Sequence, residues 1–95
     1  MVKRDTSKSI NQNRVALVTG GATRLGRQIS LTLHEAGFDL CVHCNNSVIS
    51  ADTLVEELNS SRPESAFSIV QDLTVTNFAE NIISMITVKK GRLDL

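Results

Sequence analysis

Short apolar runs alternate with helical periods of apolar residues from position 14 onward. The runs at 15–18, 39–43, 66–70 and 92–95 predict four strands, the first of them buried on both faces. Between the runs, apolar residues recur at intervals of three and four and predict three amphipathic helices. The three stripes are Leu25, Ile29, Leu33 and Ala36; then Ala51, Leu54, Val55 and Leu58; then Phe78, Ile82, Met85 and Ile86. This alternation predicts an α/β fold with right-handed crossovers in a parallel sheet.

Breaking residues mark the ends of the predicted helices. Gly37 is the expected residue just past the first helix, the polar run 59–63 ends the second, and the third is broken before Gly91. Residues 1–13 are polar and without period, and they predict a disordered tail. The region 14–95 then forms one domain portion that stops within the fourth strand.

Composition narrows the class of protein. With 95 residues, 41% of them hydrophobic, the chain suits one globular domain, and ten basic residues against ten acidic ones disfavour a nucleic-acid binder that works by charge alone. No apolar run approaches the roughly 18 residues that span a bilayer. The charged start has no apolar segment behind it, unlike a secretory signal. We therefore expect a cytoplasmic protein that binds neither nucleic acid nor membrane.

Two cysteines and two histidines are the candidates for metal or redox chemistry. Cys41 and Cys44 form a C-x-x-C pair, but there is no second pair, and on a strand the two side chains point to opposite faces. We therefore expect no metal site. His34 is expected to do no more than place charge near a helix C-terminus, and Lys89 and Lys90 to form a solvated helix end.

The most informative stretch is Thr19-Gly20-Gly21-Ala22-Thr23-Arg24-Leu25-Gly26, which lies where the buried strand becomes a helix. Backbone N–H groups and the helix dipole can meet a ligand phosphate there. Gly20 permits a tight turn, and Gly26 permits close approach of helix and strand. A P-loop is excluded because Arg27 and Gln28 follow where Lys-Ser/Thr is required. The alternative is an ordinary strand-to-helix turn.

This turn resembles T-G-x-x-x-G-x-G, the cofactor motif of the short-chain dehydrogenase/reductase family, with Arg24 in place of the middle glycine. The form Thr-Gly-x-x-x-Arg-Leu-Gly is similar to the pteridine reductase group, which uses NADPH. The resemblance implies a Rossmann-type doubly wound parallel sheet with strand order 3-2-1-4, of which this chain is the N-terminal βαβαβαβ portion. It also implies cofactor contacts by Gly20, Thr23, Arg24, Leu25 and Gly26.

Arg24 has a second implied role in orienting the pterin substrate. A guanidinium offers a planar fork of donors that suits a phosphate or a pterin carbonyl. The alternative is an arginine in the first turn of the helix that is simply exposed to solvent.

The segment after the second strand bears on the choice of cofactor. NAD-binding proteins of this architecture place an Asp or Glu there to hold the ribose hydroxyls, whereas this chain has His43-Cys44-Asn45-Asn46-Ser47. Asp39 lies at the other end of the strand. Neutral donors accommodate a 2′-phosphate, so the cofactor is expected to be NADP(H). The resemblance implies contacts by His43, Asn45, Asn46 and Ser47, although Asn46 stands where the group has arginine and Cys44 where it has tyrosine.

Asp72 and Leu73 follow the third strand. The resemblance implies that the Asp72 side chain contacts the adenine ring with Leu73 beside it. The alternative for Asp72 is a helix-capping aspartate.

The function implied by the resemblance is NADPH-dependent reduction of a pterin-like substrate by hydride transfer, in a full-length protein that forms a homotetramer. The family's catalytic residues, an Asn-Asn-Ala segment, an Asp or Ser and a Tyr-x-x-x-Lys pair, come after the fourth strand. The sequence contains no tyrosine. No catalytic residue is therefore assigned, and the chain alone is expected to be inactive. The alternatives are a 3-oxoacyl-thioester or other carbonyl reductase of the same family, and a non-catalytic nucleotide-binding module.

Overall fold

A computed structural model describes residues 13–95 as three strands alternating with three helices. Nearly all of the tail expected at 1–13 lies outside these residues. The elements follow in the order β1 (Val15–Val18), α1 (Arg24–Glu35), β2 (Asp39–Cys44), α2 (Val48–Ser61), β3 (Ala66–Val70) and α3 (Phe78–Lys90). Among residues 13–95, no helix is long and apolar enough to cross a bilayer.

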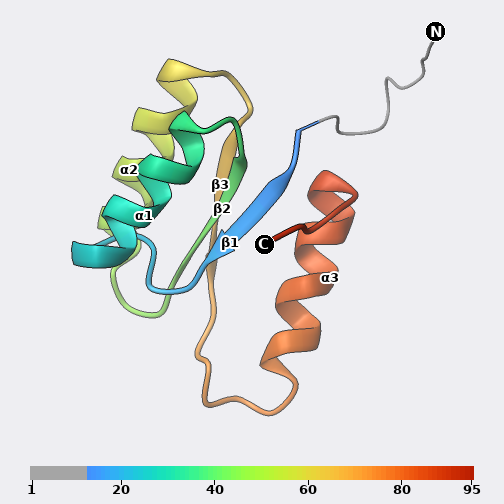
Figure 1. Ribbon diagram of the computed structural model, residues 1–95. Helices are drawn as coiled ribbons and strands as arrows, with labels where there is room; N and C mark the ends of the chain where they lie inside the picture. The colour runs from blue at the N-terminus through green and yellow to red at the C-terminus, as the bar shows by residue number, and fades with distance from the viewer. Residues whose placement is uncertain (1–12) are drawn as a thin grey trace, which may run out of the picture.

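The strands form one parallel sheet in the order β1-β2-β3, as expected for a doubly wound fold. Residues 92–95 are not assigned as a strand, although Leu95 begins a parallel ladder with β1. Its N–H donates to the Val15 carbonyl (3.2 Å), and its carbonyl accepts from the Leu17 N–H (2.7 Å). These bonds place the C-terminal residues beside β1, on the edge away from β2 (Figure 1). The expected position of residues 92–95 beside β1, on the side opposite β2, is therefore confirmed.

Helices cover both faces of the sheet, with α1 and α2 on one side and α3 on the other (Figure 1). Alternate residues of β2 divide between two cores. Leu40, Val42 and Cys44 join the core beneath α1 and α2, while Cys41 joins the core beneath α3. This confirms that the two cysteines point to opposite faces.

The stripe predicted for α2 is confirmed, whereas in the stripe predicted for α1 only Leu33 packs against the core, and Leu25, Ile29 and Ala36 are exposed. Leu25 is 73% exposed and Ile29 is 41% exposed, and the residues of α1 that are buried are Ser30 and His34. The most deeply buried residues of α1 are thus polar and have hydrogen-bond partners, and Leu31 and Leu33 pack beside them at the edge of the core. The Ser30 hydroxyl donates to the Gly21 carbonyl (3.1 Å), which lets the helix lie close to the turn before it.

The stripe predicted for α3 is correct except at Met85. Phe78, Ile82 and Ile86 lie one helical turn apart and pack against β1 and β3, whereas Met85 is 46% exposed. A step of one residue rotates a helical side chain by about 100°, which carries Met85 off the inner row.

Helix α1 ends as predicted. Gly37 has φ +104°, its N–H donates to the His34 carbonyl (3.0 Å), and the Phe38 N–H donates to the Leu33 carbonyl (3.1 Å). These two bonds are those of a Schellman motif, in which glycine takes the left-handed position.

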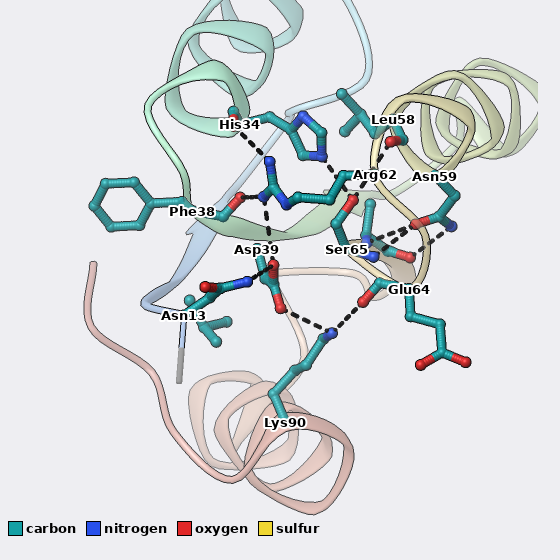
Figure 2. Close-up of polar contacts among 12 residues, drawn as sticks. Asn13, His34, Phe38, Asp39, Leu58, Asn59, Arg62, Glu64, Ser65 and Lys90 are labelled. Atoms are coloured by element: carbon teal, nitrogen blue, oxygen red, sulfur yellow. Dashed lines mark hydrogen bonds and ion pairs between the residues drawn. The ribbon is translucent and has the colours of Figure 1, made fainter. Parts of the chain in front are cut away.

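A polar network joins the elements at the edge of the sheet where the strands begin (Figure 2). Asp39, the first residue of β2, is 3% exposed and accepts from Lys90 Nζ (3.1 Å), Arg62 (3.4 Å) and Asn13 Nδ2 (3.2 Å). Lys90 Nζ also donates to the Glu64 carbonyl (2.7 Å). The expectation that Lys90 is a solvated helix end is wrong, because the last turn of α3 passes close to the start of β2.

His34 belongs to the same network, and its expected role at the helix dipole is wrong. Its Nε2 lies 2.6 Å from the Ser65 hydroxyl, and the ring is buried. Burial lowers the pKa of His34, and the nearby positive charge of Arg62 lowers it further. Arg62 donates to the carbonyls of His34 (3.1 Å) and Phe38 (2.5 Å), so its guanidinium supplies the cation at this helix end.

Candidate cofactor site

Three loops meet at the carboxyl ends of the parallel strands, at the opposite end of the sheet from the Asp39 network. The Gly21 N–H donates to the His43 carbonyl (3.0 Å), which joins the turn after β1 to the end of β2. The Gln71 N–H donates to the Cys44 carbonyl (3.0 Å), which joins the end of β2 to the segment after β3. The sequence segments 19–26, 43–47 and 71–73 are thus brought together. Ligands of open α/β sheets bind outside the carboxyl ends of the strands, at this kind of edge.

The glycine turn is closely packed on its inner side and open on its outer side. Gly20 has φ +61°, and no atom lies within 4 Å of where its Cβ would stand. A Cβ on Gly26 would lie 1.9 Å from the Gly20 carbonyl oxygen, so the first turn of α1 rests directly on the loop. Sequence reasoning missed Gly21, where a Cβ would lie 2.7 Å from the Val18 carbonyl oxygen.

The first turn of α1 presents free backbone donors. Thr23 is the N-cap residue, but its side chain makes no capping hydrogen bond. Arg24 follows with φ +52°, an unfavourable conformation for a residue with a Cβ, at the position where the family motif has glycine. Both side chains are exposed, as is Leu25. Uncapped N–H groups at a helix N-terminus, with an adjacent guanidinium, favour an anionic ligand.

A hollow of about 370 Å³ lies between the first turns of α1 and α2. Its lining residues are Ala22, Thr23, Arg24, Arg27, Ile49, Ser50, Thr53 and Leu54. Two guanidinium groups and three hydroxyl groups line it, and no carboxylate does. Arg27 also pairs with Glu57 at 2.6 Å, but both side chains are about half exposed, and such pairs contribute little to stability. Sequence reasoning did not single out Arg27, although it lies one helical turn after Thr23, a spacing that places both on one face.

His43 lies beneath this edge and not in the open space above it. The residue is 3% exposed, and both ring nitrogens have backbone partners. The Gly20 N–H donates to Nδ1 (3.1 Å), and Nε2 lies 2.7 Å from the Gln71 carbonyl oxygen. The neighbouring Asn45, Asn46 and Ser47 are exposed at the end of β2.

Asp72 forms a turn after β3. Its Oδ1 accepts from the Thr74 N–H (2.8 Å) and the Thr74 hydroxyl (2.7 Å), and these two hydrogen bonds lower the pKa of the carboxyl. The N-cap of α3 is Asn77, so the helix-capping alternative for Asp72 is wrong. The exposed, ionised carboxylate is open to solvent at the site, and Leu73 packs against the core beneath α3.

The environments of the two thiols disfavour the thiolate form that nucleophilic attack and metal binding require. Cys41 and Cys44 are free and buried, and burial raises the pKa of Cys41 to about 12. Burial also raises the pKa of Cys44, with a smaller contribution from the charge of Asp52. Thiols held in the neutral form are poor nucleophiles and poor ligands. Within the described part of the chain, no three His, Cys, Asp or Glu residues are grouped to hold a metal ion.

Comparisons with known proteins extend over most of the described residues. The profile of the short chain dehydrogenase family matches residues 14–95. Pteridine reductase 1 of Leishmania tarentolae is 47% identical over 60 residues, which are 63% of this chain and 21% of that protein. The 3-oxoacyl-(acyl-carrier-protein) reductase FabG of Staphylococcus epidermidis is 31% identical over 83 residues, 87% of this chain and 34% of that protein. Hydroxynaphthalene reductase of Aspergillus fumigatus is 34% identical over 82 residues, 86% of this chain and 30% of that protein.

The aligned stretches span between about a fifth and a third of the length of these relatives. The residues matched by the family profile are those that build the parallel sheet, the glycine turn and the loops at the carboxyl ends of the strands. By its sequence match and by the fold that carries it, the chain belongs to the short-chain dehydrogenase family, whose members are oxidoreductases that bind nicotinamide cofactors.

Proposed function

We propose that this chain binds NADPH at the carboxyl edge of its sheet, as the cofactor-binding part of a reductase that acts on a pterin-like substrate. The observation that carries the proposal is the joint arrangement of an open glycine turn, an uncapped helix N-terminus and a hollow lined by Arg24 and Arg27 without a carboxylate. The residues present fit the group, because the pyrophosphate can meet the first-turn N–H groups of α1. When bound, NADPH would supply the hydride for the reduction.

The choice of NADPH over NADH rests on charge. The exposed residues at the end of β2 are Asn45, Asn46 and Ser47, none of which repels a phosphate dianion. A hydrogen bond to a charged group contributes about 1.5–3 kcal/mol. We therefore expect the chain to bind NADPH about ten- to a hundredfold more tightly than NADH.

Isothermal titration of the 95-residue chain with NADPH and with NADH tests this assignment. Substitution of Arg24 by Ala should weaken NADPH binding about tenfold or more, because it removes a charge-assisted partner of phosphate. The Lys89→Ala variant is the matched control, since it removes the same charge from α3, on the opposite face of the sheet, where Lys89 lies over the Phe67 ring. Equal or tighter binding of NADH, or equal effects of the two substitutions, would refute the assignment.

The pterin-like substrate is proposed from Arg24 and from the similarity to pteridine reductase 1. A second candidate, reduction of a 3-oxoacyl thioester, is favoured by the match to FabG over a larger share of this chain. The assay that distinguishes the two candidate substrates is NADPH oxidation by the full-length reductase of which this chain is proposed to be a part. Faster turnover of a dihydropteridine supports the first, faster turnover of a 3-oxoacyl thioester supports the second, and no turnover of either supports a non-catalytic nucleotide-binding module. We also propose that the full-length protein forms a homotetramer, as the family resemblance implies, and sedimentation of that protein tests this.

A further inference from the structure

A single imidazole ring connects the ends of all three strands. His43 belongs to the central strand β2, and its side chain is buried on the face that packs toward α3. Its Nδ1 receives the N–H of Gly20, which follows β1, and its Nε2 contacts the carbonyl of Gln71, which follows β3. The sequence separations of these contacts are 23 and 28 residues, so the ring joins segments that the chain itself does not hold together.

The two partners fix the protonation of the ring. A backbone N–H can only donate, so Nδ1 must carry a lone pair. A backbone carbonyl can only accept, so Nε2 must carry the proton. The geometry therefore requires the neutral Nε2–H tautomer, because an imidazolium would have no acceptor for the Gly20 N–H.

We infer that His43 is a positioning residue that sets the shape of the cofactor turn from below without touching the cofactor. With the N–H groups of Gly20 and Gly21 both bonded to His43, the loop is held with its outer side open above Gly20. The bond to Gln71 holds the segment that carries Asp72 at a fixed distance from that loop. The inference deepens the proposed NADPH site, on which it rests, and gives His43 an indirect role in place of the direct contact that the resemblance implies.

Two substitutions test the two hydrogen bonds of the His43 ring separately. His43→Asn places a carbonyl oxygen near the Nδ1 position and retains an acceptor for Gly20, but it loses the donor to Gln71. His43→Gln places an amide NH₂ near the Nε2 position and retains the donor, but it loses the acceptor for Gly20. If the ring acts by holding the turn, His43→Gln weakens NADPH binding about tenfold, while His43→Asn stays within about threefold of the unsubstituted chain.

The measurements are NADPH titration and thermal unfolding of the full 95-residue chain and both variants. A ring that only fills space would lower affinity in proportion to the loss of stability in each variant. The expected result is a difference in affinity between variants of similar stability. Equal affinity losses in both, or a larger loss in His43→Asn, would overturn the inference.

Nitrogen-15 NMR of the unsubstituted chain gives an answer that does not depend on either variant folding. We expect ring shifts of a protonated Nε2 and an unprotonated Nδ1, with slow hydrogen exchange at the Gly20 amide. The opposite tautomer, or a fast-exchanging Gly20 amide, would overturn the inference. Failure of the unsubstituted chain to bind NADPH would refute the proposed function, and the ring shifts would still decide whether His43 holds the turn.

Discussion

Gly26 offers a substitution for which helix propensity and packing predict opposite signs. It lies in the first turn of α1, where replacement of glycine by alanine normally stabilises a helix by about 1 kcal/mol. The structure predicts the reverse, because a Cβ at this position would stand 1.9 Å from the Gly20 carbonyl oxygen and 2.8 Å from the carbonyl carbon. Real Cβ atoms essentially never have a non-bonded neighbour within 3.0 Å, so the helix and the turn must separate by about 1 Å.

The magnitude follows from the nature of the contact. Overpacking costs about 1–3 kcal/mol, and the upper part of that range applies because both sides are backbone, which no change of rotamer relieves. After the gain in helix propensity, Gly26→Ala should destabilise the chain by about 2 kcal/mol. For a domain of this size, that change lowers the melting temperature by about 8–16 °C.

Thermal unfolding followed by circular dichroism measures the effect. Gln28→Ala is the matched control, because Gln28 is an exposed residue of the same helix, and its replacement should change stability by less than about 0.5 kcal/mol. A melting temperature of Gly26→Ala equal to or above that of the unsubstituted chain would refute the close packing of helix on turn. NADPH titration of the same variant should show weaker binding, since the displaced first turn of α1 no longer presents its N–H groups in place.

Three further substitutions test other parts of the structure. Arg24→Gly removes a side chain at φ +52° and should stabilise the chain by about 0.5–1 kcal/mol in urea unfolding while weakening NADPH binding; a lower urea midpoint would contradict the strain. Lys90→Met leaves the buried Asp39 without its partner at 3.1 Å and should cost about 2–3 kcal/mol in the same assay, whereas a change below about 0.5 kcal/mol would contradict the pairing. The pKa of His34 is lowered from 6.5 by burial, so below pH 6.5 the unfolded chain takes up more protons and stability falls as pH drops. His34→Gln should flatten this dependence between pH 7.5 and 5.5, and equal slopes would show that His34 is not its source.

The apolar pattern predicted the elements that bury apolar side chains and failed where polar groups do the packing. The runs at 15–18 and 66–70 coincide with β1 and β3, and the stripe of α2 is buried as expected. Helix α1 departs from its pattern because Ser30 and His34 face the sheet. Their partners lie in other segments, with the Ser65 hydroxyl 31 residues from His34, so no local period could have indicated them.

The candidate site was predictable as a set of segments but not as a set of contacts. Parallel strands bring the segments after β1, β2 and β3 to one edge whatever their side chains are. The role of Asp39, in contrast, depends on Lys90, 51 residues away, and that of His43 depends on a carbonyl 28 residues away. Residue type and spacing could place these residues at an end of the sheet, but only the folded backbone determines what they bind.

Different side chains satisfy the buried backbone and polar groups at the two ends of the strands. One end holds an internal ion-pair network, and the other is the candidate cofactor site. At the end where the strands begin, the buried Asp39 carboxylate forms ion pairs with Lys90 and Arg62. These two cations therefore belong to an internal network. At the end where the strands stop, a charged side chain at position 43 could not make both hydrogen bonds that His43 makes. A carboxylate could accept from Gly20, but it could not donate to the Gln71 carbonyl, and it would put a negative charge beneath a phosphate.

A lysine or arginine at position 43 could donate to the Gln71 carbonyl, but it would leave the Gly20 N–H without an acceptor. A neutral imidazole does both with one rigid ring and adds no charge. Of the two guanidinium groups that line the hollow, Arg27 pairs with Glu57, so Arg24 is the one available to an anionic ligand. A chain whose formal net charge is zero can in this way place an exposed guanidinium beside an uncapped helix N-terminus, where the proposed anionic cofactor would bind.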